Sequence, residues 1–347
     1  MQPIIFTKLN PAIEILGLIY MSQNPNLLGN ANFVGATAKS VLSDEERYQI
    51  FGGILSRYVA AFEKKVVINE ADKLFFTEAD FDFLFCVQLL FAIMPEWIDK
   101  IESIPESEIA ATLISGLREG MVDGLEDLPE LPTTAEIVHA LTQSGQSPNV
   151  CWKLLQLIGE PKQQLTHFVQ IVRKNLPAYE AALLAVKKPL AKRMELFEKA
   201  RGNAPQSKVS EIAEQLEKKP IHTVVPMLVY PGMEIAGEGY NYVGLFMDDI
   251  FQMVDKRKEA QHSSPILKVI GDSSKFEILM ALKQAPKYNL ELAKYLGLSA
   301  GTVSHHMQIL IIHGLVSLER RDGRVYYKLE KGPIRDLVSG LQMAFDM

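Results

Sequence analysis

Short polar side chains recur along one face of a predicted helix near the end of the chain. The spacing of apolar residues predicts this helix over residues 300–313, with Val303, Met307 and Leu310 turned to the core. The opposite arc and its flank carry polar side chains: Thr302, Ser304, His305 and Gln308. Gln can pair bidentately with adenine, and Ser or Thr can bond bases or phosphate. Such a face is typical of helices that read base edges in the major groove of DNA.

Two alternating segments, 316–320 and 325–329, follow this helix and predict a β-hairpin. Asp322-Gly323 between them is a strong signal for a two-residue turn. Arginines gather at the tip of the hairpin: Arg320, Arg321 and Arg324. Guanidinium groups at such a place suit a phosphate backbone or a minor groove. We expect them, together with Ser299 just before the helix, to anchor the phosphates of double-stranded DNA.

The elements before the hairpin follow the helix-turn-helix plan. Asn289 is the predicted N-cap of a helix that carries apolar residues on its buried face: Leu292, Ala293 and Leu296. Gly297-Leu298-Ser299 then forms a tight turn, because Gly suits the left-handed position after a helix and Ser caps the next helix. Helix, turn, helix and basic hairpin, in this order, predict a winged helix-turn-helix.

Residues from about 265 to 330 resemble the winged helix-turn-helix of the arsenic-repressor (ArsR-like) family. The similar stretches are Val269-Ile270-Gly271-Asp272, Phe276-Glu277-Ile278-Leu279, Leu290-Glu291-Leu292-Ala293, Leu298 to Met307, Gly314-Leu315-Val316 and Arg324-Val325-Tyr326-Tyr327. The resemblance covers about a quarter of the chain. It implies a bacterial, dimeric transcriptional regulator whose dimer is built from the helices that flank the DNA-reading unit.

The chain departs from this family where many of its members bind metals. Those members use cysteines on the helix that corresponds to residues 289–296, which has none here. Others use Asp and His on the last helix, which here has Asp336 but no His. Cys86 and Cys151 are far apart in the sequence, and we interpret them as buried, reduced thiols. We therefore expect no metal site and no cofactor.

An apolar stripe marks the last helix, residues 333–347: Ile334, Leu337, Val338, Leu341 and Phe345. A helix this short is unstable by itself, so it must pack on its own domain or on a second subunit. Together with the family resemblance, the stripe favours a homodimer. A twofold dimer predicts a palindromic DNA site with half-sites about one helical turn apart.

The predicted fold class is mainly α with small β elements. Residues 1–220 show mainly helical periodicity and form a predicted helical body. Residues 221–262 hold two predicted strands, 221–230 and 241–247, and then a connecting helix and linker. Residues 263–347 hold the winged helix-turn-helix and the dimerisation helix.

Composition and charge agree with a soluble, cytoplasmic protein. Hydrophobic residues make up 48% of the chain and charged residues 22%, which excludes a wholly disordered protein. The longest apolar stretch, 83–94, is too short for a membrane span, which needs about 20 residues. Residues 263–347 carry 11 Lys and Arg against 8 Asp and Glu, whereas the remaining residues carry 25 against 34. The basic end of an otherwise acidic chain favours nucleic-acid contact at the C-terminus.

These patterns predict a sequence-specific DNA-binding transcriptional regulator, a dimeric repressor that is controlled through its N-terminal body. The body is much larger than a DNA reader needs, so we expect it to bind an unknown effector or protein partner. Aromatic residues could line an effector pocket there, although core packing explains them as well: Trp97, Trp152, Tyr230, Tyr240 and Tyr242.

Two other classes of function compete with this prediction. No Walker, G-x-S-x-G or H-E-x-x-H pattern is present, so we predict no catalytic residues and no enzyme. The alternative function is a protein-interaction module whose winged helix does not bind DNA. In that case Ile311 and Ile312 would form part of the contact with a protein partner.

Overall fold

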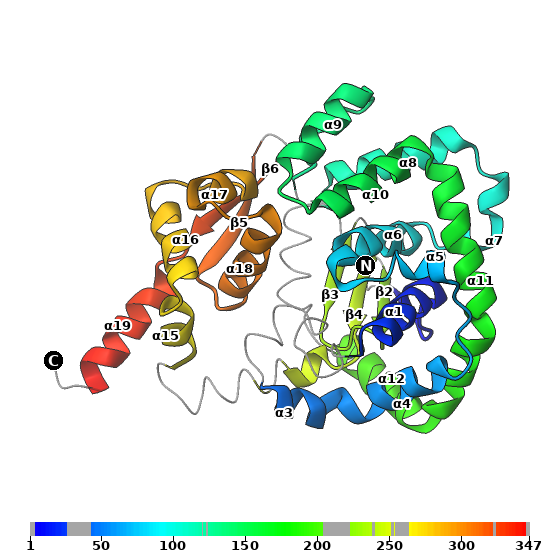
Figure 1. Ribbon diagram of the computed structural model, residues 1–347. Helices are drawn as coiled ribbons and strands as arrows, with labels where there is room; N and C mark the ends of the chain where they lie inside the picture. The colour runs from blue at the N-terminus through cyan, green and yellow to red at the C-terminus, as the bar shows by residue number, and fades with distance from the viewer. Residues whose placement is uncertain are drawn as a thin grey trace.

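The computed structural model describes residues 4–25, 43–119, 121–122, 124–203, 223–237, 240–250, 253, 264–321 and 324–344. A large helical body with a small sheet is followed by a C-terminal winged helix-turn-helix (Figure 1). The predicted fold class, mainly α with small β elements, is confirmed.

Helices form most of the body, and many begin where the sequence places a capping residue. The Oδ1 atom of Asn10, for example, accepts a hydrogen bond from the Ala12 amide at 2.9 Å and so begins the first helix. The longer helices are α1 (Pro11–Gln23), α4 (Gly53–Glu63), α6 (Phe81–Ile93), α8 (Glu106–Arg118), α9 (Thr134–Gln143), α10 (Pro148–Gly159), α11 (Pro161–Ala185) and α12 (Lys187–Asn203). Shorter helical segments are α3 (Asp44–Arg47), α5 (Glu70–Lys73), α7 (Trp97–Lys100), a π-helical turn at Tyr48–Gly52 and 3₁₀ turns at Glu78–Asp80 and Ile101–Ser103.

The sheet of the body has the strand order β1-β2-β4-β3. β1 (Ile4–Ile5) pairs in parallel with β2 (Thr223–Met227), and β2 pairs in parallel with β4 (Tyr240–Gly244). β3 (Glu234–Gly237) runs antiparallel to β4. The sequence predicts strands in the regions of β2 and β4, but it predicts a loop where β3 lies. It gives no signal for β1, because two residues are too few to show a period.

One apolar core joins the helices and the sheet of the body. It includes residues from α1, α4, α6 and α11 and from the strands, so parts on both sides of residue 220 pack together. Helix α1 is buried along nearly its whole length, from Ala12 to Met21. Among the described residues, no single helix is long and apolar enough to cross a membrane. Only the pair Glu78–Ile93 and Trp97–Ser103, bent by 91°, would qualify when taken together, and the apolar side chains of α6 are mostly buried in this core.

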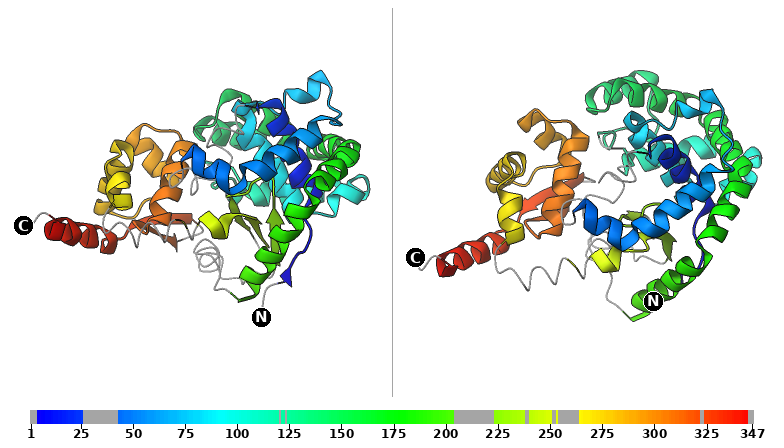
Figure 2. Two further views of the ribbon diagram at one scale, coloured as in Figure 1. Left: turned by 90° about the horizontal axis from the view of Figure 1, so that it is seen from below. Right: turned by 60° about the horizontal axis from the view of Figure 1, so that its bottom comes forward.

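The winged helix-turn-helix has an apolar core of its own. Its elements are α15 (Ser264–Ile270), α16 (Ser273–Gln284), α17 (Asn289–Leu296), α18 (Ala300–Ile312), β5 (Val316–Arg321), β6 (Arg324–Leu329) and α19 (Gly332–Ala344). Ile278, Leu292, Val303 and Leu310 are buried where its helices meet. Helix α19 lies on the far side of this unit from the body (Figure 2).

Candidate nucleic-acid interface

The turn between α17 and α18 has the predicted geometry. Gly297 follows α17 with φ +66° and ψ +27°, a left-handed conformation that glycine adopts without steric cost. Ser299 then begins α18, because its Oγ accepts a hydrogen bond from the Thr302 amide at 3.0 Å. The left-handed Gly297 and the N-cap Ser299, both predicted from the sequence, thus fix the angle at which α18 leaves the turn.

Helix α18 presents a polar face away from its core. Val303, Met307 and Leu310 are buried, as expected from their spacing. Thr302 and Gln308 are exposed, whereas Ser304 and His305 are half-buried. The exposed polar side chains lie along the N-terminal two thirds of the helix, the part that such helices insert toward base edges.

Asn289 holds α17 and α18 together, a role that the sequence does not reveal. The sequence predicts Asn289 as a capping residue, but Tyr288 occupies that position, and its amide donates to Glu291 at 3.1 Å. The side chain of Asn289 turns inward instead. Its Nδ2 donates to the Ala300 carbonyl at 3.2 Å and to the Ser304 hydroxyl at 2.9 Å. The hydroxyl of Ser304 therefore already has a partner within the protein.

The hairpin after α18 forms with the predicted pairing. β5 and β6 are antiparallel, with Val316 opposite Leu329 and Arg321 opposite Arg324. The backbones of Arg320, Arg321 and Arg324 are therefore at the tip of the wing, while Asp322-Gly323 lies outside the described residues. Lys287 exchanges two backbone hydrogen bonds with Tyr327, at 3.2 and 2.8 Å, and so attaches the wing to the residues before α17.

Comparison with known proteins identifies the family of this unit. Residues 272–317 match the model of the bacterial regulatory protein, arsR family. The chain is also 31% identical, over 80 residues, to the arsenical resistance operon repressor of Staphylococcus aureus; the match covers 77% of that protein and 23% of this chain. The chain belongs to the arsR family. No solved structure matches it.

Membership of the arsR family makes the chain a DNA-binding transcriptional regulator. The matched residues 272–317 begin at the cap of α16 and end in β5, so they include the turn and the whole of α18. They contain five of the side chains predicted to contact DNA: Ser299, Thr302, Ser304, His305 and Gln308.

One histidine of the arsR-family helix α18 lies next to an ion pair. His306 is half-buried near Asp272 and Lys275, whose charged groups are 3.1 Å apart. Burial, with the positive charge of Lys275, lowers the pKa of His306. Among the described residues, the buried Nδ1 atom of His306 has no hydrogen-bond partner. Also among the described residues, no group of three or more His, Cys, Asp or Glu side chains is placed to hold a metal ion.

The predicted dimerisation stripe on α19 divides between the interior and the surface. Leu337 is buried, Ile334 and Leu341 are half-buried, and Val338 is 48% exposed. Phe345 lies outside the described residues. Further large apolar side chains are exposed on α15 and α16: Leu267, Phe276 and Met280. The arsR-family unit thus buries only part of the stripe by itself.

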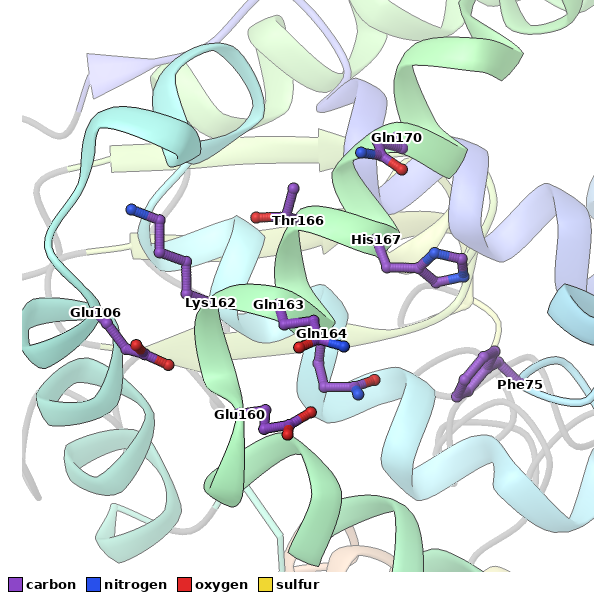
Figure 3. A pocket seen from close by; sticks show the side chains of 9 residues that line it. All are labelled: Phe75, Glu106, Glu160, Lys162, Gln163, Gln164, Thr166, His167 and Gln170. Atoms are coloured by element: carbon purple, nitrogen blue, oxygen red, sulfur yellow. The ribbon is translucent and has the colours of Figure 1, made fainter.

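A groove on the surface of the body has a mainly polar lining. It has a volume of about 700 Å³ and lies along the start of α11, between Phe75 and Glu106 (Figure 3). In this groove the Nε2 atom of His167 forms a hydrogen bond with the Asp72 carboxylate at 2.9 Å. Lys162 donates hydrogen bonds to the backbone carbonyls of Glu102 and Ile104.

The aromatic residues considered for an effector pocket do not line this groove. Trp97 and Tyr230 are fully buried in the core of the body, and Tyr242 is 4% exposed there. Trp152 is 58% exposed, and nothing is described of the Tyr240 side chain. The core-packing interpretation is therefore confirmed for Trp97, Tyr230 and Tyr242.

Proposed function

We propose that the protein is a dimeric, sequence-specific repressor whose DNA binding is controlled through the body. The observation that carries the proposal is the polar face of α18, on which Thr302 and Gln308 are exposed. Ser299 and Asn289 hold the first turns of this helix in place. In this assignment Thr302, Ser304, His305 and Gln308 contact bases. Ser299 and the arginines of the wing, Arg320, Arg321 and Arg324, contact phosphates.

The dimer is the second element of the proposal. Val338 on α19 and Leu267 on α15 are about half exposed, although both are apolar. Helices α15 and α19 flank the DNA-reading unit, and a second copy would cover these side chains. A twofold arrangement would place two α18 helices on successive major grooves, and its operator would be palindromic.

The effector of this regulator is proposed to differ in class from that of its relative. That relative is an arsenical resistance operon repressor. Here α17 carries no cysteine, and burial raises the pKa of the Cys86 thiol to about 12. A thiol held in this way is a poor ligand for a soft metal ion, because the thiolate is the binding form. We therefore assign control to the body, acting in the cytoplasm through an effector or protein partner.

The experiment that tests the proposal is selection of genomic DNA by the full-length protein. Fragments of the source genome are incubated with the protein at near-physiological salt, and the retained DNA is sequenced. We expect one palindromic motif, which the double variant Gln308→Ala/Arg321→Ala fails to enrich.

Two results would contradict the proposal. If the retained fragments share no motif, the protein does not bind DNA in a sequence-specific way. If binding does not weaken as the salt concentration is raised, the protein does not neutralise phosphates, because phosphate contacts release counterions and so make binding depend on salt. The second result would favour the protein-interaction module.

A further inference from the structure

A loop of the body touches the first turn of the DNA-reading helix. Gly145, between α9 and α10, has φ +74°, and a Cβ atom built on it would lie 3.1 Å from the backbone nitrogen of Ala300. The same position lies 3.7 Å from Cβ of Ser299. Helices α9 and α10 are on the side of the body that is nearest to the winged helix (Figure 1). The backbone of Gly145 is therefore in contact with the start of α18.

Hydrogen bonds and packing within the body fix the conformation of the α9–α10 loop. Ser144 is fully buried, and its Oγ donates to the Leu141 carbonyl at 2.8 Å and accepts from the Gln146 amide at 3.2 Å. Ser147 caps α10 through the Val150 amide. Gly124, with φ +89°, packs directly against the backbone of Ser144. This support makes the loop a fixed projection of the body.

The projection covers a place that phosphates occupy when a helix start meets DNA. The first amides of a helix have no partner within the helix, and they attract anions. Ala300 carries such an amide, and it is 1% exposed although it is not part of the winged-helix core. Ser299 and Thr302, which we assign to DNA contact, lie on the same turn. Gly145 and a phosphate cannot both occupy this position.

The dimensions of DNA make the exclusion general. The major groove is about 12 Å wide, and a helix with its side chains is about 10–12 Å across. A groove that holds α18 has no room for a second chain against the end of the helix that enters it. While the loop remains seated on Ala300, α18 is therefore unable to dock.

We propose that this contact is autoinhibitory: the α9–α10 loop and DNA compete for the first turn of α18. The inference rests on the proposed function, and it assigns control by the body to one contact. An effector or partner that moves the loop away from Ala300 would release the DNA reader. A ligand that strengthens the contact would have the opposite effect.

A reversible lock tests the contact directly. In the double variant Gly145→Cys/Ser299→Cys the two Cβ atoms would be 3.7 Å apart, within the range of about 3.5–4.5 Å that a disulfide requires. The full-length protein is oxidised, the bond is verified by mass spectrometry, and binding to a labelled pool of genomic duplexes is measured before and after reduction. We expect the oxidised double variant to bind DNA more weakly than the same variant after reduction; the Ser299 hydroxyl is absent from both states, so its loss does not affect the comparison. The two single-cysteine variants, treated in the same way, are the controls, since Cys86 and Cys151 remain present.

A larger side chain at position 145 tests the contact by weakening it. Asn tolerates a left-handed backbone, so Gly145→Asn keeps the turn while its side chain pushes against Ala300. We expect DNA affinity to rise by about 5- to 150-fold, the usual range of coupling between two sites. The matched control is Gly314→Asn, also left-handed at φ +66°, where an added Cβ would meet a side-chain carbon of Pro333 at an ordinary 3.7 Å.

The outcomes separate the contact from the function on which it rests. Failure of the disulfide to form, or equal DNA binding by the locked and reduced protein, would overturn the autoinhibitory contact while leaving the regulator intact. Absence of DNA binding by the wild type, the reduced double variant and Gly145→Asn alike would overturn the proposed function, and the inference with it.

Discussion

Glu14 in α1 links three parts of the body through one buried carboxylate. It accepts hydrogen bonds from the amides of Leu228 and Val229 after β2, at 2.8 and 3.0 Å, and from the Tyr58 hydroxyl of α4 at 2.9 Å. Burial raises the pKa of Glu14 from 4.5 to about 7, because the loss of water outweighs the three donors that favour the charged form. The folded protein therefore keeps a proton on Glu14 at pH values where the unfolded chain has released it.

The sign of the resulting pH dependence follows from this difference. Because the folded-state pKa is the higher one, the stabilising contribution is complete below about pH 4.5, decreases as the pH rises and is lost above about pH 7. The step from 4.5 to about 7 corresponds to about 3 kcal/mol, at about 1.4 kcal/mol per pKa unit. This is a large part of the free energy of unfolding of a typical domain, which is about 5–15 kcal/mol.

The variant Glu14→Gln removes the titration and keeps the shape of the side chain. Its carbonyl can still accept from the backbone amides, and its NH₂ group can donate to the Tyr58 oxygen. We expect the free energy of unfolding of the variant, relative to wild type, to rise by about 3 kcal/mol between about pH 4.5 and about pH 8. The exposed Glu63→Gln on α4 is the matched control, and its difference from wild type should stay near zero.

Urea denaturation followed by tryptophan fluorescence measures this difference. The chain has two tryptophans, Trp97 and Trp152, and both lie in the body, so the signal reports on the part that contains Glu14. A difference between Glu14→Gln and wild type that is independent of pH would refute the reasoning. A difference that falls as the pH rises would show that the three donors outweigh burial.

Three further predictions concern the DNA-reading unit. Asn289→Ala removes two hydrogen bonds of about 1 kcal/mol each between α17 and α18, so hydrogen exchange in α18 should speed up and DNA affinity should fall; unchanged exchange would exclude the positioning role of Asn289. Val338→Asp places a charge in the proposed dimer contact and should shift the protein to monomers in sedimentation velocity; a wild type that is already monomeric, or a variant dimer as stable as the wild type, would exclude this interface. Arg321→Ala should reduce the slope of log affinity against log salt by about 0.9 if this side chain neutralises one phosphate, and an unchanged slope would remove it from the interface.

The parts of the interface that the sequence predicts well are those fixed by near neighbours. Gly297 and Ser299 specify the turn before α18, because a left-handed residue and a hydroxyl cap act within a few positions of the chain. Spacing alone identified the buried face of α18, since Val303, Met307 and Leu310 recur at the helical period. The pairing of β5 with β6 follows from the Asp-Gly turn signal and the alternation on each side.

Contacts between residues that are distant in the chain leave no such pattern in the sequence. The pairing of Ile4 with Thr223 joins residues more than two hundred positions apart, through a strand of two residues. Asn289 looked like a capping residue, because its partners Ala300 and Ser304 lie on another helix and become neighbours only when α17 and α18 pack. Periodicity and capping rules describe one element at a time, so they do not register a side chain that connects two.

Gly145 shows why a regulatory contact is hidden even when its residue is conspicuous. A glycine between two predicted helices is expected from the turn alone, and the φ of +74° fully accounts for its presence. The same absence of a Cβ atom is what lets the backbone of the loop approach Ala300. Both requirements select the same amino acid, so the sequence is equally consistent with a free turn and with a turn seated on the DNA-reading helix. The relative affinity of Gly145→Asn and Gly314→Asn for DNA distinguishes them, because the two variants share the backbone strain and differ in the contact with α18.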